Sequence, residues 1–127
     1  MAAGLGVFVG LLGTIAFLVA GLPLAARIVS SDSAFGLRSA DTDGDSLIWH
    51  LANGAIGRDL LRIAVANLMI TVVALVYWGE EAVQSALVVT VIVISLCGAV
   101  LALVHGLMTA RALGKAKQAF PPGYRRY

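Results

Sequence analysis

The sequence predicts an all-α integral membrane protein with three transmembrane helices. Three apolar stretches, free of acidic and basic residues except for Arg62, predict spans at about residues 4–26, 60–78 and 82–110. A bilayer core of about 30 Å needs about 20 apolar residues in helical form. Composition agrees, because 60% of the 127 residues are hydrophobic and only 13% are charged, whereas a soluble domain has about 25% charged residues. We therefore expect a single membrane domain.

The first span is expected to remain in the protein rather than to be cleaved as a signal peptide. No Lys or Arg precedes it, and it is longer than the usual apolar core of a signal peptide. It carries Gly6-x-x-x-Gly10, a spacing that allows helix backbones to approach closely in lipid. Gly6 and Gly10 are therefore predicted to pack against another helix.

Residues 27–59 are predicted to form a loop on the inner side of the membrane, with an interfacial helix between the first and second spans. Thr42-x-x-Asp45 approximates a capping box, which satisfies free N–H groups where a helix begins. The apolar residues Leu47 and Leu51 follow at helical spacing, as in helices that lie in the interface plane.

No metal site is predicted in this loop, although Asp41-x-Asp43-x-Asp45 resembles the start of a calcium-binding loop. A calcium loop needs glycine at its sixth position and a bidentate glutamate at its twelfth. The chain has Ser46 and Ala52 there. No cofactor is implied by any other pattern.

The second and third spans carry a few polar and small residues whose roles can be weighed. Asn67 lies on one helix face with Thr71, and a buried amide needs a partner, so that face is predicted to meet another helix. His105 has no nearby carboxylate on its own helix and is interpreted as a packing residue. The single cysteine, Cys97, is expected to be buried. Residues four apart predict a packing row in the third span: Gly98, Ala102 and Gly106.

The Lys and Arg residues predict the orientation of the chain. Four of the nine fall between the first span and the start of the second, the last of them Arg62, and five follow the third span, whereas the hairpin at Glu80 and Glu81 has none. Since Lys and Arg are enriched in cytoplasmic loops, we expect the N-terminus outside, the long loop inside and the basic tail 111–127 in the cytoplasm. That tail is predicted to contact anionic lipid headgroups. Nucleic acid is not expected as a partner, because no basic groove or stacking platform accompanies the tail.

The loop contains a pattern that resembles the signature of SdpI-family membrane proteins. That signature runs Gly-aliphatic-Arg-Thr-Pro, with a Thr, a Trp and then a His or Asn at fixed distances. Here serine replaces the first Thr, and Ala40 stands where the family has proline. The residues that keep the spacing are Gly36, Arg38, Ser39, Thr42, Trp49, Asn53 and Gly57.

The resemblance implies a function in immunity or signalling at the bacterial cytoplasmic membrane. The named member of the family protects a bacterium from its own secreted killing peptide and helps a membrane signalling loop to sense that peptide. That member is longer, and this chain looks like the half that bears the signature.

Two residues of the signature have alternative roles. Arg38 is predicted either to tie the loop to the Trp49 helix, through Asp45 or Asp41, or to bind a lipid phosphate. Trp49 is interpreted as an interface anchor in preference to a ligand platform.

An enzyme is not expected, because no nucleophile lies beside a base and no carboxylate pair occurs within a span. Two functions remain, and both depend on a membrane-protein partner. One is an immunity or signal-receiving protein of the SdpI type that acts by helix–helix recognition in the bilayer. The other is an accessory subunit of a larger bacterial membrane complex, such as a respiratory or cell-envelope assembly.

Overall fold

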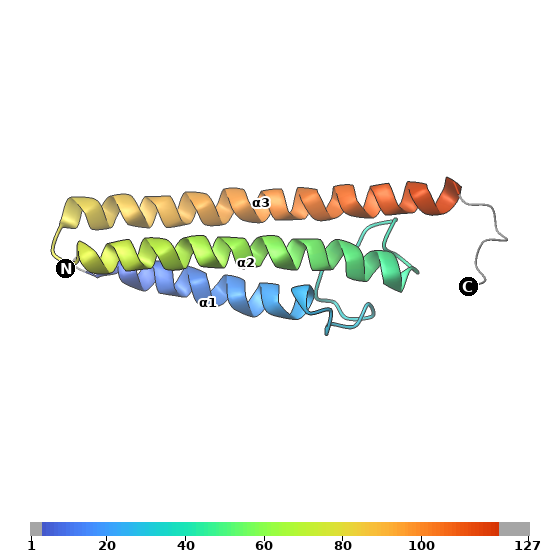
Figure 1. The fold of residues 1–127 in the computed structure, drawn as a ribbon, viewed down its shortest axis with the longest axis horizontal. Helices are drawn as coiled ribbons and strands as arrows, with labels where there is room; N and C mark the ends of the chain where they lie inside the picture. The colour runs from blue at the N-terminus through green and yellow to red at the C-terminus, as the bar shows by residue number, and fades with distance from the viewer. Residues whose placement is uncertain (1–3, 120–127) are drawn as a thin grey trace.

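A computed structural model describes residues 4–119 as three helices joined by two connections (Figure 1). Helix α1 covers Leu5–Ala25, α2 covers Ser46–Val76 and α3 covers Glu81–Ala119. The described range contains no strand. Each helix is long and apolar enough to cross a membrane, which confirms the predicted all-α class and its three candidate spans.

Helix α2 begins earlier than predicted. Residues 46–57, which were expected to form a separate interfacial helix, are the first part of one continuous helix with the second span. The stretch contains no proline, and its side chains from Ala52 to Gly57 are buried against the rest of the protein. Tertiary contact thus favours continuing the helix over turning it into the interface plane.

Helix α3 also exceeds its predicted span. With 39 residues it is about 58 Å long at 1.5 Å per residue, nearly twice the thickness of a bilayer core. The first part of the predicted basic tail, Arg111–Ala119, is therefore helical. The remainder of that tail, from residue 120 on, lies outside the described residues.

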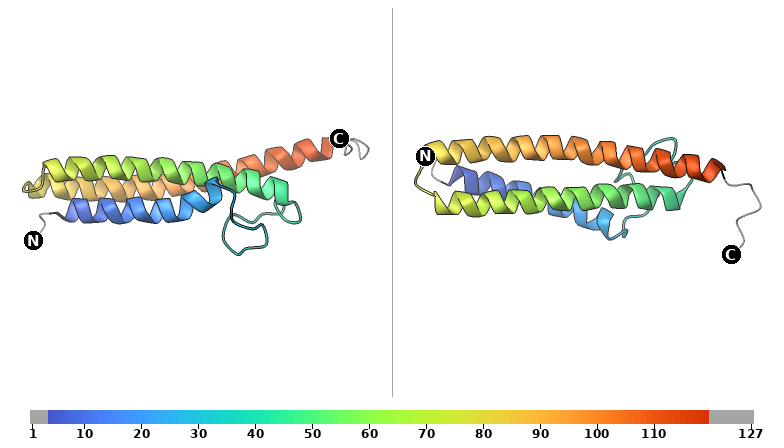
Figure 2. Two further views of the ribbon diagram at one scale, coloured as in Figure 1. Left: turned by 60° about the horizontal axis from the view of Figure 1, so that its bottom comes forward. Right: turned by 45° about the horizontal axis from the view of Figure 1, so that its top comes forward.

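The helices run alternately up and down, and α2 lies beside both α1 and α3 (Figures 1 and 2). We call the end that holds the α1–α2 loop (residues 26–45) the loop end, and the end with the α2–α3 turn (residues 77–80) the hairpin end. In all views α3 continues beyond the other helices at the loop end. Helix α1 begins at the hairpin end, where Gly4 lies against the ring of Trp78.

Small residues face the helix contacts in the structure. A Cβ added at Gly10 would touch Thr71 of α2, and one added at Gly6 would lie 2.6 Å from the Gln84 Oε1 of α3. On α3, Gly98 faces Ile63 and Gly106 faces Ile56, both on α2. Ala102 is buried between these two glycines. The row Gly98, Ala102 and Gly106 therefore lies at the contact of α3 with α2.

Polar side chains tie the helices together inside the apolar bundle. Asn67, which is 0% exposed, donates from Nδ2 to Ser95 Oγ of α3 at 3.1 Å, so its face meets another helix as predicted. Gln84, also 0% exposed, accepts from the Gly6 N–H of α1 and donates to the Ala74 carbonyl of α2. One amide thereby joins all three helices near the hairpin end. A buried amide is costly unless it is hydrogen-bonded, and this one is.

Cys97 differs from its prediction, because it is exposed on the surface of α3 rather than buried. A helix that contacts the bundle along one narrow row leaves most of its apolar residues facing outward, and Cys97 is one of these.

Candidate functional site

The α1–α2 loop is held on α2 by the side chain of Asn53. Its Oδ1 accepts from the Leu37 N–H at 2.6 Å, and its Nδ2 donates to the Leu37 carbonyl at 3.2 Å. The same Nδ2 donates to the Trp49 carbonyl one turn earlier on α2 at 3.0 Å. Asn53 is 1% exposed. The amide thus satisfies both main-chain groups of Leu37, as a neighbouring strand would, and fixes the loop by its backbone.

Gly36 allows this close approach for two reasons. Its φ of 119° lies in the region that L side chains rarely adopt. A Cβ built at this position would also lie 2.8 Å from Asn53 Oδ1 and 2.8 Å from Trp49 Cζ2. The structure therefore brings together Gly36, Trp49 and Asn53, which the sequence had grouped by spacing alone.

Trp49 is a core residue, and its interpretation as an interface anchor is wrong. It is 2% exposed and packs with Leu24, Ile56 and Ala102 from all three helices. Its ring meets that of His50 edge-on, with centroids 5.0 Å apart. The indole is therefore covered by the bundle and has no free surface to offer to an interface.

Ser39 and Thr42 form a local turn in the loop. Thr42 Oγ1 accepts from the Ser39 N–H at 2.8 Å and donates to the Ser39 carbonyl at 3.1 Å. The predicted capping box is wrong, because the helix begins at Ser46 and its N-cap is Asp45. Asp45 Oδ1 accepts from the Ile48 N–H at 3.1 Å, which satisfies one of the free donors at the start of α2.

Arg38 does not pair with Asp45 or Asp41. The Arg38 side chain is exposed, and its Nη2 donates to the carbonyls of Ser31 at 2.9 Å and Ser33 at 2.5 Å. These contacts close the loop on itself instead of tying it to α2. The guanidinium group carries several N–H donors, so it can bond to both of these main-chain carbonyls at once.

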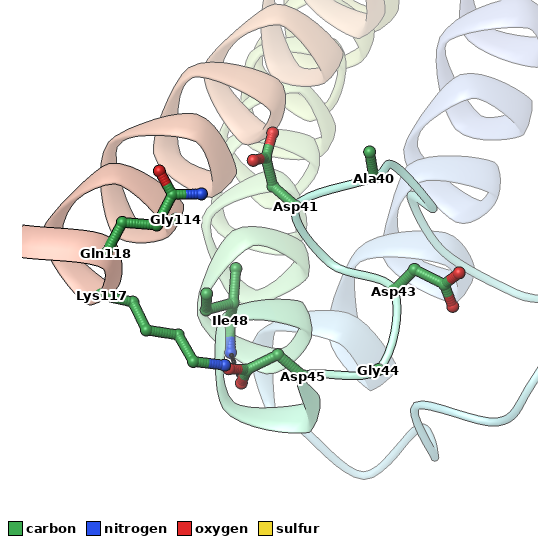
Figure 3. A pocket seen from close by; sticks show the side chains of 9 residues that line it. All are labelled: Ala40, Asp41, Asp43, Gly44, Asp45, Ile48, Gly114, Lys117 and Gln118. Atoms are coloured by element: carbon green, nitrogen blue, oxygen red, sulfur yellow. Dashed lines mark hydrogen bonds and ion pairs between the residues drawn. The ribbon is translucent and has the colours of Figure 1, made fainter. Parts of the chain in front are cut away.

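Asp45 pairs instead with Lys117, near the end of α3. Figure 3 shows the Lys117 side chain reaching across to the Asp45 carboxylate beside the first turn of α2. The hydrogen bond from Lys117, followed by that from the Ile48 N–H, holds the pKa of Asp45 below its usual range. The C-terminal part of α3 thus packs on the loop end. The contact of Lys117 with Asp45 was not expected, because the tail was predicted to contact lipid headgroups.

Asp41, Asp43 and Asp45, at the end of the loop, do not converge. They line, with Gly114 and Lys117, a depression of about 380 Å³ between the loop and α3. In Figure 3 the Asp43 side chain points away from those of Asp41 and Asp45. Asp41 lies against Gly114, where an added Cβ would be 2.8 Å from its Oδ1. Within residues 4–119 no three His, Cys, Asp or Glu side chains lie close enough to hold a metal ion.

Gly57, the last residue of the signature, lies at the contact of α2 with the end of α1. A Cβ at Gly57 would meet the backbone of α1 at Ala25 N, Gly21 O and Leu24 C. Because these are main-chain atoms, α1 would have to move as a whole to admit a side chain. Gly57 therefore sets the distance between α1 and α2 at the loop end.

An apolar pocket of about 360 Å³ lies beside the Gly36–Asn53 contact. It opens between the helices, with Arg38 and Phe35 from the loop at its edge. The pocket can accept an apolar side chain or part of an acyl chain. Its other walls come from the three helices: Ala20, Leu24, Ile56, Leu60, Ala99 and Leu103.

His105 has an ionisable partner that the sequence analysis missed. Its Nδ1 lies 2.6 Å from Asp59 Oδ2 of α2, and the other oxygen of Asp59 accepts from Arg62 Nη1 at 2.6 Å. The signal was present, because Asp59 is the one acid near the start of the second span. Which helix face it occupies relative to α3 could not be read from either segment alone.

Comparison of the chain with protein-family models, curated proteins and solved structures finds no match. The resemblance to the SdpI family therefore depends on the residues of the signature alone.

Proposed function

We propose that this chain is a non-enzymatic, multi-pass protein of the bacterial cytoplasmic membrane that acts as an SdpI-type immunity or signal-receiving protein. The observation that supports this most is the contact among Gly36, Trp49 and Asn53. A chance match of spacing would not require Gly36, in the loop, to lie against Trp49 and Asn53 of α2. Here a Cβ at Gly36 would meet both the Trp49 ring and the Asn53 amide.

The apolar pocket beside this contact is the proposed recognition site. It is lined by apolar side chains from α1, α2 and α3, and its edge carries the exposed Arg38. A killing peptide that inserts into the membrane presents apolar side chains. Such a side chain fits a pocket of this size and character.

Expression of the chain alone in a bacterium sensitive to a secreted, membrane-active killing peptide tests this proposal. Survival should rise with the wild-type chain and fall again with Leu103→Trp, because the larger ring fills the pocket. Leu101→Trp is the matched control, since Leu101 lies on the same helix, is exposed and does not line this pocket. Failure of the wild-type chain to protect, at a confirmed expression level, contradicts the proposal.

A second function, an accessory subunit of a larger membrane complex, is favoured by the outer surface of α3. Of the most apolar 18-residue stretch of α3, only 11% is buried, against 28% of the corresponding stretch in each of the other two helices. Large apolar side chains remain outward on it, among them Val93, Leu96, Val100 and Val104. A subunit interface would cover this face.

Purification in mild detergent separates the two functions. A subunit should retain one partner at constant stoichiometry and lose it in Val100→Trp, while Leu103→Trp should have little effect. For an immunity protein, Leu103→Trp should lower survival in the survival assay, and Val100→Trp should have little effect on it.

A further inference from the structure

Two arginines converge at the loop end without a carboxylate between them. The Cβ position of Gly54 lies 3.7 Å from Arg27 Nε and 3.7 Å from Arg58 Nη1. Both side chains are exposed. Among residues 4–119 the ion pairs involve Arg62, His105 and Lys117, and neither Arg27 nor Arg58 is in one. Like charges held this close repel each other, so an anion between them would be bound favourably.

The backbone at Arg27 is strained in a way that this placement explains. Arg27 is the one residue other than glycine with positive φ, at 57°, in the described part of the chain. The Arg27 N–H donates to the Leu24 carbonyl and the Ile28 N–H to the Pro23 carbonyl, both at 3.2 Å. This is the helix-ending motif in which glycine is strongly preferred at the position of Arg27. A side chain kept at conformational cost points to a function.

The close contact at Gly57 holds the two arginines in register. Because Gly57 lets the last turn of α1 lie against the backbone of α2, the residue that ends α1 is placed beside the next turns of α2. Gly54 and Arg58 lie one turn apart on that helix. The pair is therefore built into the crossing of α1 and α2.

The depth of the pair matches the phosphate level of a bilayer. Arg58 precedes Trp78 by about 20 residues, or roughly 30 Å along the helix, which is one hydrocarbon thickness. Trp78 is half exposed at the hairpin end. Because indole rings prefer the membrane interface, Trp78 would mark the interface on the opposite side. Exposed apolar side chains of Leu22 and Ile28 flank Arg27 and offer surface to an acyl chain.

We propose that Arg27 and Arg58 together bind the phosphate group of one anionic phospholipid at the loop end of the bundle. Guanidinium groups match phosphate geometry through paired N–H donors. The proposal requires the membrane placement given above but not the immunity function. A negative survival assay would leave it intact.

Binding of phosphatidylglycerol and phosphatidylcholine to the purified full chain in neutral detergent, measured by native mass spectrometry, tests the site. Arg27→Gln and Arg58→Gln should each weaken phosphatidylglycerol binding about tenfold, because each removes charge-assisted hydrogen bonds. The double variant should bind phosphatidylglycerol about as weakly as either single variant, since the two residues share one ligand and their effects are not additive. Arg111→Gln, a matched exposed arginine on α3, should have a smaller effect than either. Equal small losses in all three single variants would mean diffuse attraction and overturn the site.

Two further arms decide the source of the phosphate and the role of Arg27. Inorganic phosphate at millimolar concentration should not displace the lipid, and if it does so the site binds a soluble phosphate and the lipid assignment is wrong. Arg27→Gly should be at least as stable as the wild type in lipid-free detergent, because glycine accepts positive φ, yet should bind lipid as weakly as Arg27→Gln. A loss of lipid-free stability in Arg27→Gly would make Arg27 a structural residue and overturn the proposal.

Discussion

At the scale of single residues, a few amides and carboxylates organise an otherwise apolar chain. Asn53, Asn67 and Gln84 are all nearly inaccessible, and each bonds to a segment distant in sequence. In lipid, apolar surface gives helices little reason to associate, whereas a polar side chain without a partner is costly. The amides therefore select which faces meet, and the small residues allow them to meet closely.

Replacing Asn53 by leucine should release the α1–α2 loop while leaving the helices formed. The change leaves the N–H and carbonyl of Leu37 without their partners, at a cost of about 1–3 kcal/mol in unfolding free energy. Hydrogen exchange should speed up over residues 33–42 but not in the middle of α2 or α3. Gln118→Leu, at an exposed position on α3, should change stability by less than about 0.5 kcal/mol. Unchanged exchange in the loop would show that Asn53 does not hold it.

Asp45 should make the loop end sensitive to acid. Lys117 and the Ile48 N–H lower the pKa of Asp45 in the folded protein, so its contribution is fully present above the ordinary aspartate pKa of about 3.9 and is lost as pH falls below it. Asp45→Asn keeps an acceptor for Ile48 but cannot titrate. The variant should therefore lose less stability than the wild type between pH 6 and pH 3.

At neutral pH the same substitution should cost no more than about 1 kcal/mol, because the Lys117 side chain is 46% exposed and surface ion pairs are weak. Thermal unfolding in one detergent across this pH range measures both effects. Parallel curves for the two proteins would show that Asp45 does not contribute to the acid response.

At the scale of helices, the distance between α1 and α2 is set by glycine on one face of α2. Gly54 and Gly57 lie three residues apart on that face and are both buried. Their surroundings differ. A Cβ at Gly57 would lie 2.3 Å from the backbone nitrogen of Ala25, whereas a Cβ at Gly54 would lie at ordinary van der Waals distance from its neighbours, 3.8 Å from the Leu24 carbonyl. The same substitution at the two positions should therefore have opposite effects.

Gly57→Ala should destabilise the bundle by about 1–3 kcal/mol, the usual cost of overpacking, even after the gain in helix propensity. Gly54→Ala should be neutral or stabilising by up to about 1 kcal/mol, because alanine favours the helix and fits the space. Melting temperatures of the two variants and the wild type in one detergent make the comparison. Similar shifts for both would mean that α1 does not approach α2 closely at Gly57.

At the scale of the whole molecule, the sequence predicts the number and order of the helices but not their ends or their partners. Composition shows where the longest apolar stretches stop, but segments outside them, such as 46–57 and 111–119, can continue the helix when tertiary contacts support them. Periodicity gives faces of single helices, as it did for Asn67. It does not specify which faces meet, so the pair of Asp45 with Lys117 and that of Asp59 with His105 could not be foreseen.

The orientation of the molecule in the membrane is the remaining prediction. In the described chain the Lys and Arg residues lie in the α1–α2 loop, in α2 up to Arg62, or in the last part of α3 from Arg111 on, while Glu80 and Glu81 lie at the hairpin end. Since Lys and Arg resist translocation in short loops, the loop end should face the cytoplasm, where the leaflet is rich in anionic lipids. In a Cys97→Ser background, an impermeant thiol reagent should label Glu81→Cys in intact cells and Gln118→Cys only after permeabilisation. The opposite pattern would place Arg27 and Arg58 in the outer leaflet and separate them from the lipids that they are proposed to bind.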